Sequence, residues 1–596
     1  MLKAGVCFIF GGARFCLLHS SLFDSNEPHE LKVKSFSLLF CHVWAVCLFT
    51  LGLRSRISVA LLALLLLLPF VYLIGLAGTS MVQAPGVLTH LASTILPDLI
   101  WQTVYLCLGV VVLTSTMGVL PAWWVSAHEF PGRKWLEWLL LLPMAMPSYV
   151  IAYAYTDALQ YSGWVASSLR GVLGSDFRIP EIRSTTGAIL VLSFVLYPYV
   201  YIMARTAFLG RSPSMLDAAR SLGHSATSAF LKVGLPVARP AWVVGLTLVL
   251  METLAEYGAL SYFGVRTFTT AIFNTWLNLG DRESAALLAV MLLAVMLTLI
   301  VFESKARGRA QFYTQSGKGT TIERKRLKGA QAWMVVFLST MPLILGFVLP
   351  VWILLALIVD IDTSINWARS FRWAYHSALL GAMAAAVAVV LAVFLAYVKR
   401  QAHVWWVTAI YRLISLGYGV PGAILAIAIL LPLASVDRFT FDMGWQIPAL
   451  TGSVLALVYA YNVRFTSAAL QSVDSGLQQI TKHIDESARI LGRTPRQVLW
   501  HVHLPVLKGS VATGMLLVIV DVIKELPATL VLRPFDFDTL AVVSYQFASD
   551  ERLTEAAVPA LMIVMIALVP ILLLIRQGAK QARSSKASKP NQGGVM

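Results

Sequence analysis

The stretch that decides the fold is Asp217-Ala218-Ala219-Arg220-Ser221-Leu222-Gly223, which runs on to Val233-Gly234-Leu235-Pro236. It recurs 269 residues later, without a gap, as Glu486-Ser487-Ala488-Arg489-Ile490-Leu491-Gly492 and Val502-His503-Leu504-Pro505. Seven of the 20 aligned positions are identical. Both copies are polar islands in a chain of 596 residues that is 58% hydrophobic and 13% charged, whereas soluble domains carry about 25% charged residues. The pattern predicts a membrane protein with two like halves.

Long apolar runs predict an all-α polytopic membrane protein, because lipid offers no hydrogen-bond partner to an exposed backbone. About twelve transmembrane helices are expected, six in each half. Their predicted positions are 57–78, 99–126, 135–156, 187–209, 239–262, 284–303, 332–358, 374–398, 404–433, 448–470, 509–532 and 556–576.

The distribution of Lys and Arg predicts the orientation. With the N-terminus in the cytoplasm, the inside segments hold 25 Lys and Arg residues and the outside segments hold 10. Positive residues accumulate on the cytoplasmic side of membrane proteins, so both copies of the repeat are expected there. The net charge of +16 is then explained by cytoplasmic loops that face anionic lipid, and no nucleic-acid partner is expected.

These assignments divide the chain into five parts. They are an uncertain N-terminal extension at 1–56, a first half at 57–303, a basic cytoplasmic linker at 304–331, a second half at 332–576 and a basic cytoplasmic tail at 577–596. Within the extension, Ser35–Leu53 is apolar enough for a marginal extra span. If it crosses, the count becomes thirteen and the N-terminus lies outside.

The duplication extends beyond the polar stretch. Two acidic residues in the fifth predicted span stand opposite two in the eleventh, again 269 positions apart. A Tyr-x-Tyr pair at 197–199 matches one at 459–461, with an offset of 262. Six helices separate equivalent elements, and an even number preserves their direction. The halves are therefore expected to be parallel repeats, related by an axis along the membrane normal.

Each copy has features of a short helical hairpin. The acidic residue that opens it is expected at a helix N-terminus, where negative charge is favoured. Gly223 and Gly492 are expected at a turn between two short helices, because glycine costs about 1 kcal/mol inside a helix. The proline that closes each copy is expected to start the next helix.

Both copies resemble the cytoplasmic EAA loop of ABC importer permeases, E-A-A-x3-G-x9-I-x-L-P. They read D-A-A-x3-G-x9-V-x-L-P and E-S-A-x3-G-x9-V-x-L-P, within loops 213–236 and 482–505. The resemblance implies that each loop docks on one of two copies of a separate ABC ATP-binding subunit. The coupling residues that it implies are Asp217, Ala218, Ala219, Gly223, Leu235, Pro236, Glu486, Ser487, Ala488, Gly492, Leu504 and Pro505.

The chain itself is expected to bind no cofactor, with ATP and Mg on the partner subunit. Ser316–Thr320 resembles a phosphate-binding loop, but Phe312 stands where the first glycine belongs and Gly319 follows the lysine. Gly417–Gly422 matches G-x-G-x-x-G, but it lies in an apolar span and contains a proline. We interpret it as a helix break.

A wider resemblance concerns the substrate. The segments Lys524–Leu530, Arg533–Phe535, Phe537–Ala541 and Leu254–Ala259 are similar to those of fused double permeases for ferric iron. This implies a bacterial inner-membrane subunit supplied by a periplasmic binding protein. Fused permeases for thiamine, polyamines and aminophosphonates share much of the pattern and remain alternatives. A membrane-embedded enzyme is a remote alternative, since the cytoplasmic loops lack paired DxxxD stretches.

Four acidic residues inside the predicted spans are candidates for the translocation path: Glu252, Glu256, Asp521 and Glu525. Intramembrane charges usually face a cavity, and hard cations prefer oxygen ligands. The hypothesis is that the four converge near the pore axis and give a cation a transient binding step. The alternative is packing or gating, with Lys524 partly neutralising Asp521.

Other polar groups are given simpler roles. Six tyrosines are expected in packing or in an aromatic belt at the membrane surface, with lining of the pore as the alternative: Tyr149, Tyr153, Tyr155, Tyr197, Tyr199 and Tyr201. His501 and His503 are expected to be docking contacts, and no metal site is firmly assigned.

Overall fold

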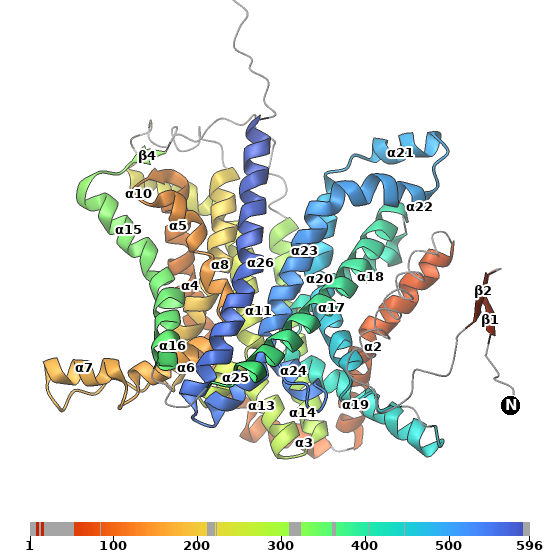
Figure 1. Cartoon of the computed structure of the whole chain (residues 1–596), viewed down its shortest axis with the longest axis horizontal. Coiled ribbons are helices and arrows are strands. Elements are labelled where there is room, and N and C mark those ends of the chain that lie inside the picture. The colour runs from red at the N-terminus through yellow and green to blue at the C-terminus, as the bar shows by residue number, and fades with distance from the viewer. Residues whose placement is uncertain are drawn as a thin grey trace, which may run out of the picture.

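Figure 1 shows the computed structural model, in which helices run between two ends of the molecule. The structure describes residues 7–10, 13–16, 53–83, 85–210, 221, 223, 225–308, 324–359, 365–402, 404–445 and 448–587. Two short strands, β1 (Cys7–Phe10) and β2 (Ala13–Cys16), form an antiparallel hairpin. The possible extra span lies, apart from Leu53, outside the described residues.

The first half runs from α2 to α14. Its elements are α2 (Leu53–Gln83), α3 (Pro85–Thr94), α4 (Leu96–Ala127), β3 (His128–Glu129), α5 (Arg133–Leu139), η1 (Leu142–Ala145), α6 (Ser148–Leu159), α7 (Trp164–Leu173), α8 (Thr185–Gly210), α10 (Ala226–Ala229), η2 (Phe230–Gly234), α11 (Leu235–Ala255), α12 (Gly258–Tyr262), α13 (Phe268–Phe273), η3 (Asn274–Asn278) and α14 (Arg282–Gly308).

The second half repeats this order. Its elements are β4 (Lys325–Arg326), α15 (Gly329–Leu343), η4 (Ile344–Val348), α16 (Leu349–Val359), α17 (Trp367–Gln401), α18 (Trp405–Ser415), η5 (Gly417–Gly419), α19 (Gly422–Asp442), α20 (Val454–Gln478), α21 (Lys482–Ile490), α22 (Pro495–Val498), η6 (Leu499–His503), α23 (Leu504–Lys524), α24 (Pro527–Leu532), α25 (Leu540–Ser549) and α26 (Leu553–Ala587).

Three long helices form the centre of each half. In the first half α4, α8 and α11 pack on one another, and in the second half α17, α20 and α23 do the same. Small residues permit the close approach. A Cβ at Gly245 would lie 3.0 Å from the Cα of Val200, and one at Gly514 would lie 3.2 Å from the Cα of Ala469. Gly514 stands 269 positions after Gly245, and Ala469 stands 269 positions after Val200. The offset between α8 and α20 is therefore the same as the offset between the two polar repeats.

This register corrects the tyrosine pairing inferred from the sequence. With an offset of 269, the Tyr-x-Tyr pairs at 197–199 and 459–461 do not occupy equivalent positions. Two tyrosines spaced by two residues are a weak marker, because aromatic residues are common in membrane helices. The glycine contacts between helices decide the register instead.

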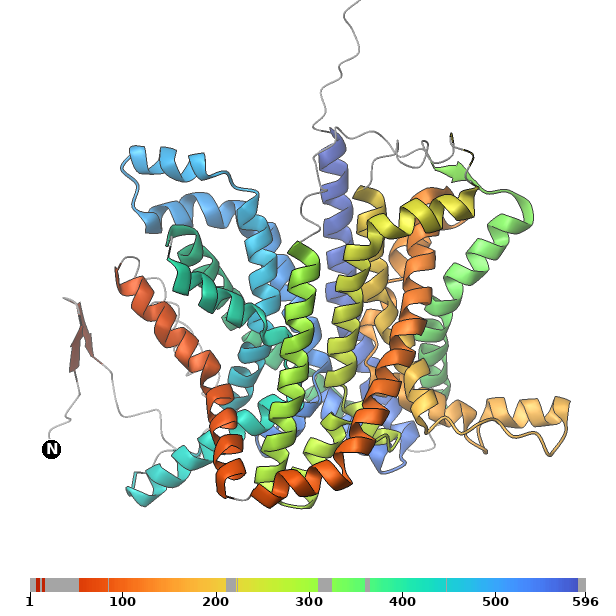
Figure 2. The same ribbon diagram turned by 180° about the vertical axis from the view of Figure 1, so that it is seen from behind.

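The halves are interlocked by their first helices. α2 packs against α18 and α19 of the second half, and α15 and α16 pack against α5 and α6 of the first half. Each first helix also contacts the last helix of its own half, α14 or α26. In Figure 2 the first helix lies beside the second half. The first helix of each half therefore packs against both halves and joins them into one bundle.

Ten helices in the described residues are long and apolar enough to cross a membrane, and eleven if the bent pair Arg133–Ala145 and Ser148–Leu173 counts as one span. The predicted span 448–470 is α20, which is not among them. It carries Asn462, Arg464 and Asp474, and its inward side is buried in the bundle. The spans predicted at 135–156 and 404–433 are both broken, at η1 and at η5. The second break confirms the interpretation of Gly417–Gly422.

The segments between and after the halves differ from their predicted bounds. α14 extends to Gly308 and α15 begins at Gly329, so the linker is shorter than 304–331 at both ends. Before α15, Lys325 and Arg326 of β4 pair in parallel with His128 and Glu129 of β3. α26 continues to Ala587, beyond the predicted start of the tail at 577.

Candidate functional site: the coupling loops and a carboxylate cavity

The described parts of both polar repeats lie at the same end of the molecule. Figure 1 shows α10 of the first loop and α21 and α22 of the second loop at the top, together with the end of α26. The Lys and Arg distribution assigns this end to the cytoplasm.

The second loop is a helical hairpin closed by glycine. Gly492 follows α21 with a φ of 74°, a left-handed conformation that glycine adopts without strain. The amide of Arg493 donates to the carbonyl of Ala488 at 3.1 Å, which satisfies the end of the helix. Thr494 and Gln497 then form a capping box at the start of α22. Gly223 has a φ of 83°, so the glycine turn predicted for both copies is confirmed.

The predicted position of Glu486 at a helix N-terminus is wrong. α21 begins at Lys482, so Glu486 lies in its middle, where it is exposed and 3.1 Å from His483 Nδ1. The acidic residue in the first turn is Asp485. The closing prolines behave as predicted, because Pro236 and Pro505 lie in the first turns of α11 and α23.

The tip of the second loop is apolar and exposed. Ile490 and Leu491 are 85% and 79% exposed at the cytoplasmic end of the molecule, beyond the membrane-spanning helices. Ser487 is also exposed, whereas Ala488 is buried against the chain itself. Exposed apolar residues beyond the lipid mark an interaction surface, so Ile490 and Leu491 add to the residues that the motif singled out.

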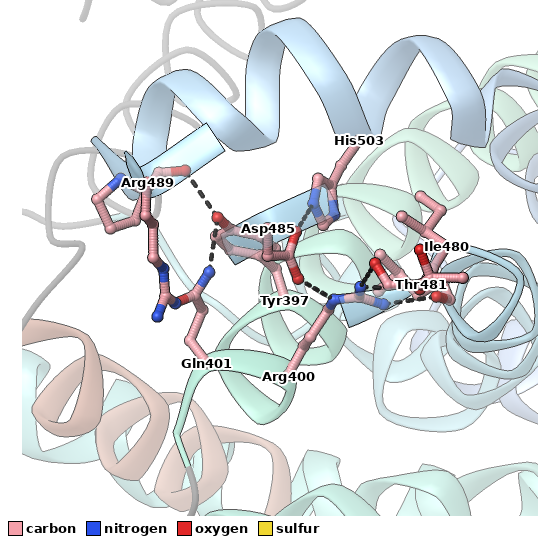
Figure 3. Close-up of polar contacts among 10 residues, drawn as sticks. Tyr397, Arg400, Gln401, Ile480, Thr481, Asp485, Arg489 and His503 are labelled. Atoms are coloured by element: carbon pink, nitrogen blue, oxygen red, sulfur yellow. Dashed lines mark hydrogen bonds and ion pairs between the residues drawn. The ribbon is translucent and has the colours of Figure 1, made fainter. Parts of the chain in front are cut away.

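A buried polar network holds α21 onto the bundle, as Figure 3 shows. Arg400 at the end of α17 donates to Asp485 Oδ2 at 2.7 Å. The ring nitrogen Nε2 of His503 lies 2.5 Å from Asp485 Oδ1. Arg400 also donates to the carbonyls of Leu477 and Ile480 at 2.6 and 2.8 Å. Asp485 therefore connects α21 to both α17 and η6, just before α23.

A second set of contacts fixes the other arm of this hairpin (Figure 3). The hydroxyl of Tyr397 donates to the carbonyl of Pro495 at 2.7 Å, and Gln401 donates to the same hydroxyl at 2.9 Å. Arg489 contacts Gln401. His503 is fully buried, so it is not the docking contact that the sequence suggested. His501 is exposed.

The first loop is held by aromatic packing at the equivalent place. Gly234 stands where the second half has His503, and Trp123 lies against it, since a Cβ at Gly234 would be 2.9 Å from the indole ring. Trp123 packs edge-on against Phe208 at a centroid distance of 5.3 Å and against Phe230 at 4.8 Å. Asp217, Ala218 and Ala219 lie outside the described residues.

The four candidate carboxylates line one cavity between the halves. Its volume is about 90 Å³, and Glu252, Glu256, Asp521 and Glu525 are all among its lining residues. Equivalent positions of the two halves line it, because α11 and α23 both end here. The four residues therefore converge on one cavity, and their role in translocation stays a prediction.

Glu256 and Glu525 occupy matching positions at helix breaks. Each ends its long helix, α11 or α23, and is followed by a short helix, α12 or α24. Glu256 Oε1 accepts the amide of Ala259 at 2.9 Å, and Glu525 Oε1 accepts the amide of Ala528 at 3.5 Å. The carboxylates thereby satisfy amides at the start of the short helices. The breaks explain why the predicted spans 239–262 and 509–532 are not continuous.

The remaining partners of these two carboxylates differ. Glu256 Oε2 accepts a hydrogen bond from Ser148 at 2.6 Å. Glu525 Oε2 forms a buried ion pair with Arg464 Nη1, also at 2.6 Å. Asp521 pairs with Lys524 at 3.0 Å, as the packing alternative for these residues expected.

Sequence reasoning did not single out Arg464, Ser148 or Tyr418 as cavity residues. An arginine in the middle of an apolar span is itself a signal, and that signal could have found Arg464. Tyr149 and Tyr199, expected in packing or in a surface belt, line the cavity with Tyr418. Tyr153, Tyr197 and Tyr201 are buried inside the first half. No group of three or more His, Cys, Asp or Glu side chains suited to a metal ion occurs in the described ranges.

Comparison with known proteins places this arrangement in a family. The model of the binding-protein-dependent transport system inner membrane component matches twice, at residues 114–305 and 388–583. The Fe(3+)-transport system permease protein FbpB 2 of Haemophilus influenzae is 26% identical over 529 residues, which cover 88% of this chain and 98% of that protein. The probable ABC transporter permease protein y4fN of Sinorhizobium fredii is 22% identical over 78% of this chain and 84% of its own length.

A shorter relative matches only part of the chain. The molybdenum transport system permease protein ModB of Escherichia coli is 29% identical over 224 residues, which are 36% of this chain and 96% of that protein. The two family matches cover more than half of the chain, and each contains one coupling loop and one pair of the cavity carboxylates. The chain belongs to the binding-protein-dependent transport system inner membrane components, as a fused double-domain, multi-pass permease of the inner membrane.

Proposed function

We propose that this chain is the pore-forming subunit of an ATP-driven importer for ferric iron delivered by a periplasmic binding protein. Two ABC ATP-binding subunits dock on the two coupling loops, 213–236 and 482–505, and carry the ATP and Mg. The chain supplies the gate and the path, and it performs no hydrolysis itself.

The carboxylate cavity is the observation that carries the choice of substrate. Four acidic side chains line it at the junction of the halves. Ferric iron is a hard cation that prefers oxygen ligands, and an intramembrane carboxylate is retained where it serves a path or a gate. Arg464 and Lys524 offset two of the four charges, and the remaining pair, Glu252 and Glu256, opposes an oxyanion such as sulfate, which one of the shorter relatives is named for.

Sequence similarity supports the same choice. The relative named for Fe(3+) transport is a double permease like this chain and aligns along 98% of its length with both halves. The relatives named for molybdenum and sulfate are shorter proteins that match about one third of this chain at similar identity, so the support from similarity lies in the shared double architecture. Thiamine and polyamines are also cationic, so a carboxylate cavity accommodates them, and they remain the second candidates. An aminophosphonate is less compatible with this wall because of its anionic phosphonate group.

Uptake by the whole transporter tests the proposal. The chain is reconstituted in liposomes with the ATP-binding subunit and the binding protein of its transport system. ATP-dependent accumulation is measured for radiolabelled ferric iron, molybdate, sulfate, thiamine and putrescine. We expect iron alone to accumulate, and Glu256→Ala and Glu525→Ala each to reduce its uptake. Uptake of an oxyanion, or iron uptake that both variants leave unchanged, contradicts the assignment of cargo and path.

A further inference from the structure

Arg464 is a buried cation that lines the carboxylate cavity. Its side chain is 8% exposed and that of Glu525 is 7% exposed, with Nη1 and Oε2 2.6 Å apart. Both residues line the central cavity. The guanidinium also lies over the ring of Phe465 at 5.1 Å. An arginine that is always charged thus occupies the position next to Glu525 that a transported cation needs.

The surrounding backbone is shaped to admit this pair. A Cβ at Gly422 would lie 2.2 Å from Glu525 Oε1 and 3.3 Å from Arg464 Nη1. A side chain at this position would therefore require the carboxylate of Glu525 to move. In the first half Ser148 follows the equivalent proline, and its hydroxyl donates to Glu256. The second half has exchanged a neutral hydrogen bond for an ion pair.

A second ion pair joins Lys524 to Asp521, which lies one helical turn before Glu525 on α23. The ammonium group of Lys524 lies 3.0 Å from Asp521, and both residues line the cavity. With the offset of 269, Arg464 and Lys524 correspond to Val195 and Ala255, which line the cavity from the first half. In the part of the chain that the structure describes, Glu252 and Glu256 form no ion pair.

From this asymmetry we infer that Arg464, assisted by Lys524, is a tethered competitor of the cargo: it occupies the carboxylates of the second half at rest, and a multivalent hard cation must displace it to pass. The inference rests on the proposed function in so far as the cargo is a cation. It names Arg464 as a residue that determines specificity at the path.

Two physical arguments support this role. An isolated carboxylate in a low-dielectric site is unstable. The buried carboxylate of Glu525 therefore needs a countercharge from the protein when no cargo is bound. A monovalent cation offers Glu525 no more charge than Arg464 does, whereas a trivalent cation offers three times as much. The competitor therefore favours multivalent cargo and opposes leakage of abundant monovalent ions.

Binding of Tb³⁺ to the purified full-length chain in nanodiscs tests the inference. Tb³⁺ is a hard trivalent cation, and its luminescence is sensitised by nearby tyrosines such as Tyr149, Tyr199 and Tyr418, which line the cavity. We expect weak sensitised binding to the wild-type chain. Arg464→Gln should bind Tb³⁺ about tenfold more tightly, because close charge pairs couple by about 1.4 kcal/mol or more. Arg464→Gln combined with Glu525→Gln should lose this gain.

The matched control is Arg205→Gln, which removes an arginine from an ion pair with Glu137 outside the cavity. It should leave Tb³⁺ affinity unchanged. A purely structural role for Arg464 predicts lower thermal stability of Arg464→Gln without any gain in affinity. If Arg464→Gln is not monodisperse, Arg464→Lys replaces it, with an expected gain of about threefold because the forked contact is lost. Unchanged or weaker affinity in the folded variant overturns the inference.

The result is separable from the test of the cargo. Tb³⁺ binding needs neither the ATP-binding subunit nor the binding protein. If Arg464→Gln gains affinity but the reconstituted transporter does not import iron, the competitor stands and the cargo is a different cation. If iron is imported and the variant gains nothing, the proposed function stands and Arg464 has another role.

Discussion

The two halves share a backbone plan but not a chemistry. At the cavity, the second half places Arg464 and Lys524 where the first half has Val195 and Ala255. At the coupling loop, the second half buries His503 against Asp485, where the first half packs Trp123 on Gly234. In both places an ionic contact of the second half replaces a neutral or apolar one of the first.

The difference shows how a duplicated permease divides its tasks. Both halves need the same helix breaks and the same docking turn, so Glu256 and Glu525, and Gly223 and Gly492, remain alike. The groups around these positions do not determine the backbone, so they are free to diverge. We interpret the first half as the carboxylate wall that is open to cargo, and the second half as the wall that carries its own countercharge.

The largest expected contrast comes from removing each carboxylate in turn. Glu525→Ala leaves Arg464 buried without its partner, which should cost about 3–5 kcal/mol of stability. Glu256→Ala removes contacts to Ser148 and to the amide of Ala259 and should cost about 1–3 kcal/mol. Thermal unfolding of the purified chain measures both. Equal losses of stability would mean that leaving Arg464 unpaired costs no more than losing the neutral hydrogen bonds of Glu256.

Exchanging the residues that follow the matching prolines, Gly422 in the second half and Ser148 in the first, should give the next largest effect. Gly422→Ser makes the second half resemble the first, and its Cβ overlaps Glu525 Oε1, so we expect a loss of about 1–3 kcal/mol. Ser148→Gly removes one hydrogen bond and should cost about 1 kcal/mol. Thermal unfolding with iron uptake checks the pair. A harmless Gly422→Ser would show that the ion pair does not need this space.

Asp485→Asn tests the ionic attachment of the second loop. The change leaves Arg400 without a carboxylate, and we expect local destabilisation of about 2 kcal/mol, because hydrogen bonds to charged groups contribute that much. Amides of α21 should then exchange about 30-fold faster in hydrogen-exchange measurements, and uptake per ATP hydrolysed should fall. Glu486→Gln is the control for the exchange measurement alone, since Glu486 is exposed and contacts His483 on its own helix. Equal protection in both variants would rule out the network as an anchor.

The smallest contrast is expected at the glycine turns, where the halves should respond alike. A Cβ at Gly223 or Gly492 meets no atom of the described chain within 4 Å, but both φ angles are positive. Replacement by Val should therefore strain the turn by about 1–2 kcal/mol and crowd the docking surface, whereas Asn tolerates this conformation. Uptake coupled to ATP hydrolysis should fall with Val and persist with Asn. Full transport by the double Val variant would contradict the docking assignment.

Much of the fold followed from local patterns. The glycine turns were predictable, because a glycine between two polar helical segments favours a turn over a continuous helix, and the closing prolines were placed correctly. The start of α21 was missed by four residues, since Lys482 and His483 carry no strong start signal. The breaks before α12 and α24 were missed because Glu256 and Glu525 lie in apolar runs of spanning length.

The amino-acid sequence alone determined the membrane class, the duplication and the matching spacing of the acidic residues, and it predicts the side of the membrane that carries the two polar repeats. These depend on composition, on the count of positive charges and on spacing along the chain. Only the tertiary structure decided that the register of α20 follows α8 at 269 positions, that Arg464 faces Glu525 and that the first helices pack on the opposite halves. Those facts depend on which side chains fit against which backbones in space, and no local pattern records that fit.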